Sequence, residues 1–271
     1  MFPAIWRGKE KLIFNKRIMS DMNTFKTPSF KKPRMTVEVW SDIMCPFCYI
    51  GKRNYEMALK QFAGRDQVEI EWRSFQLDPT IPVNKPVKEN VYQYLADRKG
   101  IPYEASVKMH ERLIQTAKEA GLDYRFDTAI VANSFDAHRM IQLAKTKGLG
   151  DEAEERLFRA YFTEGRDFGE HETLLEIGQE IGLQKEEIKE ALSSEEYAAK
   201  VEADIQDANE IGVGGVPFFV FDRKYAVSGA QPPEYFLQAL KQSFEEWRKD
   251  NPAADLLVTE GAVCSPDGEC K

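Results

Sequence analysis

The stretch SDIMCPFCYIGKRNYEM, residues 41–57, places Cys45 and Cys48 three positions apart with Pro46 between them. Residues 36–40, directly before it, form a short β-branched and aromatic run that is typical of a strand. Apolar residues after the cysteines recur at roughly helical spacing. We therefore expect a strand-to-helix junction, with Cys45 near the helix N-terminus and Pro46 at an early helical position, where its missing N–H is a donor that would be unpaired in any case.

This position predicts the chemistry of the two cysteines. Only the thiolate is nucleophilic, and a helix N-terminus lowers a cysteine pKa from ~8.5 into the range of ~3.5 to 7.5. Cys45 is therefore the predicted nucleophile. Cys48, one turn further along the same helix, is expected to be more buried and close enough to resolve a mixed disulfide at Cys45.

Two other interpretations of the cysteine pair remain. A zinc site needs two further ligands, and His110, His138 and His171 stand singly and far apart, so we predict no metal. The pair can also be two inert cysteines of the core. The redox interpretation is favoured because a strand-to-helix junction gives Cys45 an activating environment.

Charge is distributed unevenly along the 271 residues. Residues 1–34 carry a net charge of +7, whereas the whole chain carries −8, so residues 35–271 carry −15. An acidic body argues against nucleic acid as a partner, because phosphate binding needs concentrated positive charge. No run of 18 apolar residues is present, so we expect no membrane partner. The apolar content of 42% is enough for a folded core.

The basic segment 1–34 has no apolar region like that of a secretory signal. We expect it to be a disordered extension outside the fold; a transit peptide is the weaker alternative. Without a secretory signal the protein is expected in the cytoplasm, where disulfides are usually transient and catalytic. This expectation favours a redox role for Cys45 and Cys48.

The order of the predicted elements indicates the fold. Residues 68–75 alternate as a strand does, and the chain then reads as helical from about 88 to 212 before strand character returns at 218–221 and 225–228. A final helix follows from 233 to about 249. β-α-β at one end and β-β-α at the other is the thioredoxin arrangement. The predicted domains are a thioredoxin-like domain in two segments (35–84 and 212–249), an all-helical insertion (85–211) and a C-terminal tail (250–271).

Four segments, in this order, carry a family resemblance: CPFC, NSFDAHRMIQLAK, VGGVPFFVF and VSGAQPPEYFLQAL. Together they resemble the FrnE-like branch of the DsbA family of thiol-disulfide oxidoreductases, in the thioredoxin superfamily, over about residues 35–249. The resemblance implies an α/β thioredoxin fold interrupted by an all-helical insertion domain. A lone Cys-x-x-Cys would be much weaker support than four ordered segments.

The resemblance also implies roles for single residues. It makes Cys45 the nucleophile, Cys48 the resolving cysteine and Pro217 a cis-proline packed beside them, with the Val216 backbone free to pair with an extended substrate. From the residues alone, Pro217 can also be a proline that begins a strand. Phe47 stands where DsbA itself has histidine; because phenylalanine cannot donate to the thiolate, a milder oxidant is expected.

The predicted function is exchange of disulfides with protein or peptide substrates, as an oxidoreductase or isomerase. Glutathione is a further candidate partner, and no cofactor is expected. One alternative is a glutathione-dependent isomerase or transferase on the same fold, although such relatives usually place serine at the nucleophile position. The other is a redox-sensing, chaperone-like binding module in which the cysteines only change its shape.

Three polar residues outside the motif are weaker candidates. The resemblance favours a substrate-facing role for Asn133 and His138, whereas the residues alone suggest Asn133 or Ser134 as a helix N-cap and His138 as a surface residue. Glu38, on the strand before the motif, is either a buried proton acceptor for Cys48 or a solvated or edge-facing carboxylate.

Cys264 and Cys270 lie in the tail segment GAVCSPDGEC, where Ser-Pro and Asp-Gly favour a turn. Such a turn would bring the two thiols close together. A second redox pair that exchanges with Cys45 and Cys48 is one interpretation, and a reduced tail without a partner is the other; weak metal binding is a third.

Overall fold

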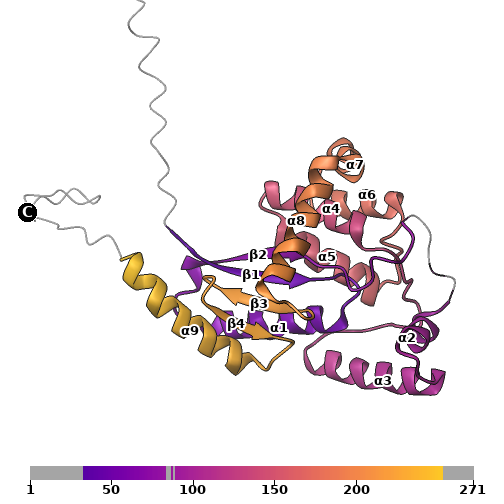
Figure 1. Ribbon diagram of the computed structural model, residues 1–271, viewed down its shortest axis with the longest axis horizontal. Helices are drawn as coiled ribbons and strands as arrows, with labels where there is room; N and C mark the ends of the chain where they lie inside the picture. The colour runs from indigo at the N-terminus through magenta and orange to yellow at the C-terminus, as the bar shows by residue number, and fades with distance from the viewer. Residues whose placement is uncertain (1–32, 84–86, 88, 253–271) are drawn as a thin grey trace, which may run out of the picture. The chain divides into compact units, whose positions relative to one another are not determined.

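The computed structural model describes residues 33–83, 87 and 89–252. Its centre is a four-stranded sheet with the order β2-β1-β3-β4 (Figure 1). The strands are β1 (Met35–Ser41), β2 (Val68–Ser74), β3 (Phe218–Phe221) and β4 (Tyr225–Ser228). β1 pairs in parallel with β2, and the pairings of β1 with β3 and of β3 with β4 are antiparallel. This is the predicted thioredoxin arrangement, and the predicted strands agree with it to within one residue at each end.

Helices α1 (Pro46–Gln61) and α9 (Pro233–Asp250) pack together on one face of the sheet. Alternate strand residues point to this face: Val37 and Val39 of β1 and Phe219 of β3 are fully buried there with Tyr55 and other aromatic residues. A one-turn 3₁₀ helix, η2 (Arg65–Gln67), leads from α1 into β2. The Cys motif is thus fixed at the start of a helix that is held by the core.

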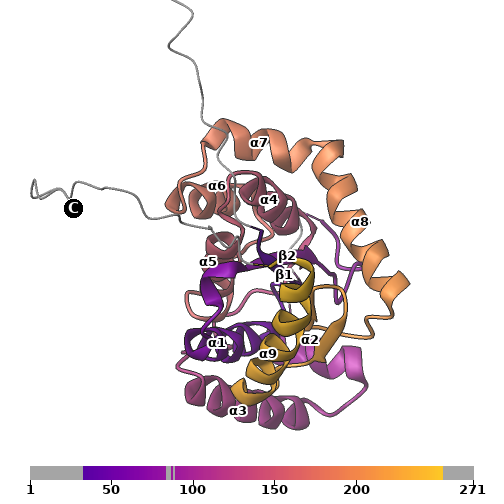
Figure 2. The same cartoon turned by 90° about the vertical axis from the view of Figure 1, so that its left-hand side faces the viewer.

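The segment between β2 and β3 is helical, as the sequence predicts (Figure 2). Its helices are α2 (Val91–Lys99), α3 (Tyr103–Glu119), α4 (Phe135–Thr146), α5 (Gly150–Phe162), α6 (His171–Glu180), α7 (Lys185–Ser193) and α8 (Glu195–Ile211). The helical stretch runs from Val91 to Ile211, within about three residues of the predicted 88 to 212. The described residues from Arg34 to 252 belong to one compact unit, and the division into a thioredoxin-like and an insertion domain stays a prediction.

Helix α8 covers part of the other face of the sheet. Trp40 of β1 is fully buried there with Ala208 and Val213, and its indole N–H donates to the backbone oxygen of Asp204 at 2.9 Å. The sheet therefore has a core on each side, one shared with α1 and α9 and one shared with the insertion.

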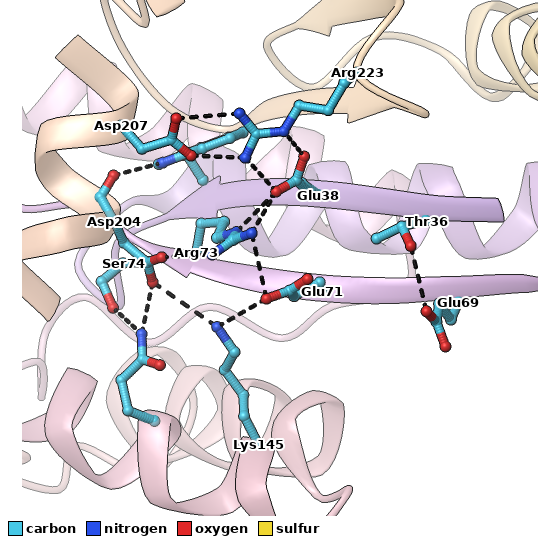
Figure 3. Close-up of polar contacts among 12 residues, drawn as sticks. Thr36, Glu38, Glu69, Glu71, Arg73, Ser74, Lys145, Asp204, Asp207 and Arg223 are labelled. Atoms are coloured by element: carbon cyan, nitrogen blue, oxygen red, sulfur yellow. Dashed lines mark hydrogen bonds and ion pairs between the residues drawn. The ribbon is translucent and has the colours of Figure 1, made fainter. Parts of the chain in front are cut away.

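A charged network joins α8 to the strands (Figure 3). The Arg73 guanidinium of β2 donates to Asp204 at 2.9 Å and to Glu38 of β1 at 3.0 Å. Arg223, in the β3–β4 turn, pairs with Glu38 and with Asp207. The network connects β1, β2, α8 and the hairpin, so it fixes the end of the hairpin that lies away from Pro217.

Several predictions fall outside the described residues. The predicted disorder of the basic extension concerns residues 1–34, of which 1–32 are not described. The predicted second redox pair, Cys264 and Cys270, also lies outside the described residues. Within the described ranges, every helix is too short or too polar to cross a lipid bilayer.

Candidate active site

Cys45 is the residue directly before helix α1. Its backbone is extended (φ −85°, ψ 110°), and α1 begins at Pro46, as predicted. The Cys45 N–H donates to the Asp42 backbone oxygen at 2.9 Å, and the Cys48 N–H donates to the Cys45 oxygen at 3.0 Å. The first turn of α1 contains no acidic residue, so the positive end of the helix is not neutralised there. The role of Cys45 as the nucleophile stays a prediction.

Cys48 is fully buried one turn further along α1. Burial, together with the adjacent Cys45, raises the pKa of the Cys48 thiol well above its usual value; the backbone of Asp42 and the Ser41 hydroxyl oppose this rise. Cys48 is therefore a poor nucleophile until a base takes its proton. Both cysteines are free thiols in the structure.

The loop before β3 lies against Cys45. The Val216–Pro217 peptide bond is cis, as the family resemblance implies. The Cys45 thiol donates to the Val216 backbone oxygen at 3.3 Å. The Val216 amide has no hydrogen-bond partner among the described residues. The Val216 carbonyl is thus bonded to the Cys45 thiol, whereas the Val216 N–H is free. Pairing of Val216 with a substrate stays a prediction.

Gly51 lets this loop approach α1. A Cβ atom at Gly51 would lie 3.0 Å from Pro217 Cγ and 3.4 Å from Phe219 Cε2. Gly51 stands one turn after Cys48, on the side of α1 that faces the loop. The absence of a side chain here therefore sets how closely Val216 can approach the Cys45 sulfur.

We expect Gly51→Val to displace the Val216–Pro217 loop. Overpacking of this kind costs about 1–3 kcal/mol of unfolding free energy, and the loss of the Val216 contact should also slow the reaction of Cys45 with a disulfide reagent. Urea unfolding and the rate of thiol release from such a reagent measure the two effects. Met57→Val is the matched control, because Met57 lies on the same helix and is 39% exposed. Equal behaviour of the two variants would contradict the packing argument.

The helical insertion also contacts the motif. The Tyr124 hydroxyl, in the segment between α3 and α4, donates to the Pro46 backbone oxygen at 2.6 Å. Its ring stacks with Phe162 of α5 at a centroid distance of 4.5 Å. The sequence contains no signal for this residue, since Tyr124 stands in an ordinary polar loop. Phe47, two residues after Cys45 in the first turn of α1, is 46% exposed.

Asn133 and His138 are buried at the start of α4. The Asn133 side chain donates to the Ile81 oxygen and accepts from the Phe135 N–H at 2.8 Å, so it helps to begin α4. A His138 ring nitrogen lies 2.9 Å from the Phe75 oxygen. The expectation that His138 is a surface residue is wrong, because α4 packs into the interior. The substrate-facing role of both residues stays a prediction.

Glu38 is buried rather than solvated, because it is paired with Arg73 and Arg223. The interpretation of Glu38 as a solvated carboxylate is therefore wrong, and both of its partners in the network of Figure 3 are arginines. Among the described residues, no group of three or more His, Cys, Asp or Glu is arranged to hold a metal ion.

Comparison with known proteins gives consistent matches. A family model described as "DSBA-like thioredoxin domain" matches residues 36–241. The chain is similar to the crystal structure of a probable DsbA oxidoreductase from Streptomyces coelicolor, with 38% identity, a TM-score of 0.74, and coverage of 88% of this chain and 99% of that one. It is similar in fold to the cytosolic disulfide reductase DsbM from Pseudomonas aeruginosa, which has also been solved with GSH (20% identity, TM-score 0.57, coverage 78% and 99%). A curated relative, the uncharacterized protein YwbO of Bacillus subtilis, is 28% identical over 207 residues, which are 75% of this chain and 94% of the relative.

Proposed function

Because this chain belongs to the family of proteins with a DSBA-like thioredoxin domain, we propose that it is a thiol-disulfide oxidoreductase or isomerase that acts on protein or peptide substrates through Cys45 and Cys48. The observation that carries the proposal is the placement of Cys45. It stands at the N-terminus of α1, its sulfur contacts the Val216 carbonyl, and Cys48 lies one turn behind it.

The proposed reaction proceeds in two exchanges. The Cys45 thiolate attacks a substrate disulfide, forms a mixed disulfide and releases one substrate thiolate. Cys48 then loses its proton and attacks the Cys45 sulfur, which forms the Cys45–Cys48 disulfide and releases the second substrate thiolate. The substrate is reduced by two electrons and the cysteine pair is oxidised by two, so no cofactor is needed. The reverse sequence oxidises a dithiol substrate.

Several features favour an extended polypeptide as the substrate. The Val216 amide is free to donate to a peptide carbonyl, and Phe47 offers an exposed apolar ring close to Cys45. Phe47 cannot donate a hydrogen bond to the thiolate, so we propose that this protein is a milder oxidant than DsbA. We also propose that it is related to the FrnE-like branch. Asn133 and His138 contact the backbone oxygens of Ile81 and Phe75, so in this proposal they support the loop after β2, and a substrate-facing role for them is part of the same proposal.

Glutathione is proposed as a second thiol partner. The disulfide reductase DsbM, which shares the fold, has been solved with GSH. If glutathione reduces the Cys45–Cys48 disulfide in this protein, a glutathionylated Cys45 peptide should be found by mass spectrometry after brief treatment with reduced glutathione.

Capture of a substrate tests the proposal. In a Cys48→Ser variant with Cys264→Ser and Cys270→Ser, intact insulin should remain attached to Cys45 as a mixed disulfide, because no second thiol can resolve it. Non-reducing electrophoresis and mass spectrometry of the linked peptide measure the capture. The same variant with Cys45→Ser is the control and should capture nothing. A non-catalytic binding module would form no covalent adduct in either protein, and that result would rule out the proposed reaction.

A further inference from the structure

Asp42 is a fully buried residue in the turn between β1 and the cysteine motif. Its Oδ1 atom accepts from the Met44 N–H at 3.3 Å, and its Oδ2 atom accepts from the Leu77 N–H at 2.6 Å. The first hydrogen bond lies within the turn, whereas the second reaches the loop after β2, 35 residues further along the chain. Each carboxyl oxygen is thus used by a backbone N–H group, and the side chain joins two segments that are distant in the sequence.

The main chain of Asp42 holds Cys45. The Cys45 N–H donates to the Asp42 backbone oxygen at 2.9 Å, which closes a turn from Asp42 to Cys45. Inside this turn the bond from the Met44 N–H to the Asp42 side chain has the spacing of an Asx-turn, in which a side-chain oxygen takes the place of a backbone acceptor. Cys45 ends the turn with its sulfur 3.3 Å from the Val216 oxygen. The shape of the turn therefore determines where the proposed nucleophile stands.

The segment after β2 is held against this turn. The Phe75 N–H donates to the Ser41 backbone oxygen at 3.0 Å, and two residues further the Leu77 N–H donates to Asp42. The Leu77 backbone oxygen accepts from the Arg98 guanidinium of α2. The Leu77 side chain is nevertheless 37% exposed, so this loop reaches the surface beside the motif. The Asp42 side chain therefore connects the cysteine turn to an exposed loop.

Backbone N–H groups, rather than a cation, are the partners of the Asp42 carboxyl. A His138 ring nitrogen lies 3.8 Å from Asp42 Oδ1, but the same nitrogen lies closer, at 2.9 Å, to the Phe75 oxygen. Burial lowers the pKa of His138, so this histidine is neutral near pH 7. Because buried polar groups need hydrogen-bond partners, loss of the Asp42 side chain would leave the Met44 and Leu77 N–H groups unpaired.

We propose that Asp42 is a positioning residue for the exchange at Cys45: its side chain fixes the turn that carries the nucleophile and ties this turn to the loop after β2. This inference rests on the proposed function. In this role Asp42 accepts two hydrogen bonds and takes no proton from either cysteine. The exchange itself is unchanged, since Cys45 bonds to one substrate sulfur and the other leaves as a thiolate.

Two substitutions separate the two contacts. Asparagine keeps one side-chain oxygen, which the Met44 N–H can use because it is only two residues away. The amide nitrogen that replaces the second oxygen cannot accept from the Leu77 N–H. Asp42→Asn should therefore keep the turn and release the loop, whereas Asp42→Ala should lose both contacts.

The reaction of Cys45 with 5,5′-dithiobis(2-nitrobenzoate) tests the turn. In full-length protein with Cys48→Ser, Cys264→Ser and Cys270→Ser, Cys45 is the only thiol of the chain, and its attack releases one nitrothiobenzoate ion, which stopped-flow absorbance follows. We expect Asp42→Ala to slow this release by about 10²-fold, because a misplacement of ~1 Å costs a rate factor of this order. Asp42→Asn should stay within about threefold of the parent variant, since the turn is kept.

Equal slowing in the alanine and asparagine variants would show that the carboxyl acts in another way, as a proton acceptor for example, and would overturn the inference. An unchanged rate in Asp42→Ala would overturn it too, while leaving the proposed function intact. If Cys45 of the parent variant, which retains Asp42, does not react at all, the proposed function fails and this inference fails with it.

Asp78→Ala is the matched control for a general loss of stability. Asp78 stands in the same loop and is 6% exposed, and it accepts from the Thr80 N–H at 3.0 Å and from the Tyr94 hydroxyl at 2.7 Å. These contacts do not involve the cysteine turn. Asp78→Ala should therefore lower the midpoint of urea unfolding, as Asp42→Ala does, but should keep the rate of the Cys45 reaction. A rate as low as that of Asp42→Ala would reduce the role of Asp42 to stability alone.

Hydrogen exchange measured by mass spectrometry tests the contact with the loop. Peptides that contain Leu77 should lose protection in Asp42→Asn, because the Leu77 N–H no longer has its acceptor. Peptides from helix α9, which is distant from this contact in the sequence, should exchange as in the parent variant. Full protection of the Leu77 N–H in Asp42→Asn would contradict the proposed connection between the turn and the loop.

Discussion

Replacement of Cys45 by serine is expected to reduce the rate of insulin reduction by dithiothreitol to that of dithiothreitol alone. Serine is nearly the same size, so the fold and the contact with the Val216 carbonyl should survive. Its hydroxyl is a far weaker nucleophile toward sulfur, because the thiolate is the species that attacks a disulfide. Precipitation of the insulin B chain, followed by turbidity, measures the rate.

The tail cysteines offer a comparison in the same assay. A Cys264→Ser, Cys270→Ser variant keeps the Cys45–Cys48 pair and should react within about twofold of the wild-type rate if this pair alone carries the reaction. A larger change would support the predicted exchange between the tail and the active pair. Appreciable activity in Cys45→Ser would show that another thiol is the nucleophile and would overturn the assignment.

Asp204→Ala should be among the most destabilising single substitutions in the charged network. Asp204 is 4% exposed, and its carboxylate accepts from the Arg73 guanidinium at 2.9 Å, the Ser74 N–H at 3.0 Å and the Gln142 amide at 2.6 Å. Alanine leaves all three donors without this acceptor. Arg73 keeps Glu38 as a partner, but the Ser74 N–H and the Gln142 amide lose this acceptor inside the core, and each buried polar group left unsatisfied costs about 1–3 kcal/mol.

Urea unfolding followed by tryptophan fluorescence measures this loss. Asp207→Ala is the matched control, since Asp207 stands one turn further on α8 and pairs with Arg223, but its side chain is 30% exposed. An ion pair of that exposure contributes about 0–1 kcal/mol. If the two alanine variants were equally stable, the network of Figure 3 would not be the link between α8 and the sheet.

The sequence predicts those parts of the fold that depend on local signals. The helix that begins within CPFC has Pro46 at its first position. The hairpin strands at 218–221 and 225–228 are separated by three residues, of which Asp222 and Arg223 adopt positive φ angles of 50° and 52°. A turn, a cap and a period of apolar residues are all encoded within a few neighbouring residues. Their bounds are therefore predicted within two residues.

The polar residues behind the cysteines could not be predicted in this way. Glu154 of α5 is buried, although it stands in the run DEAEER, in which it looks like any acidic residue of a solvated helix face. Its burial depends on how α5 packs against α1 and β2, which are distant in the sequence. The same reason explains why the sequence leaves open whether His138 and Glu38 are buried or exposed, whereas the structure buries both. The cysteine pair can be recognised in the sequence from its spacing. The groups that surround it are brought together only by tertiary packing.

The contact of Tyr124 with the Pro46 carbonyl has a thermodynamic consequence. This hydrogen bond joins the insertion to the turn that contains both cysteines. If that turn shifts on oxidation, the strength of the hydrogen bond differs between the dithiol and the disulfide form. Any ligand that binds the insertion and displaces Tyr124 then changes the reduction potential of the pair. By linkage, oxidation of the pair changes the affinity for that ligand by the same factor. The redox state of the cysteine pair and the binding of such a ligand to the helical insertion are therefore thermodynamically coupled.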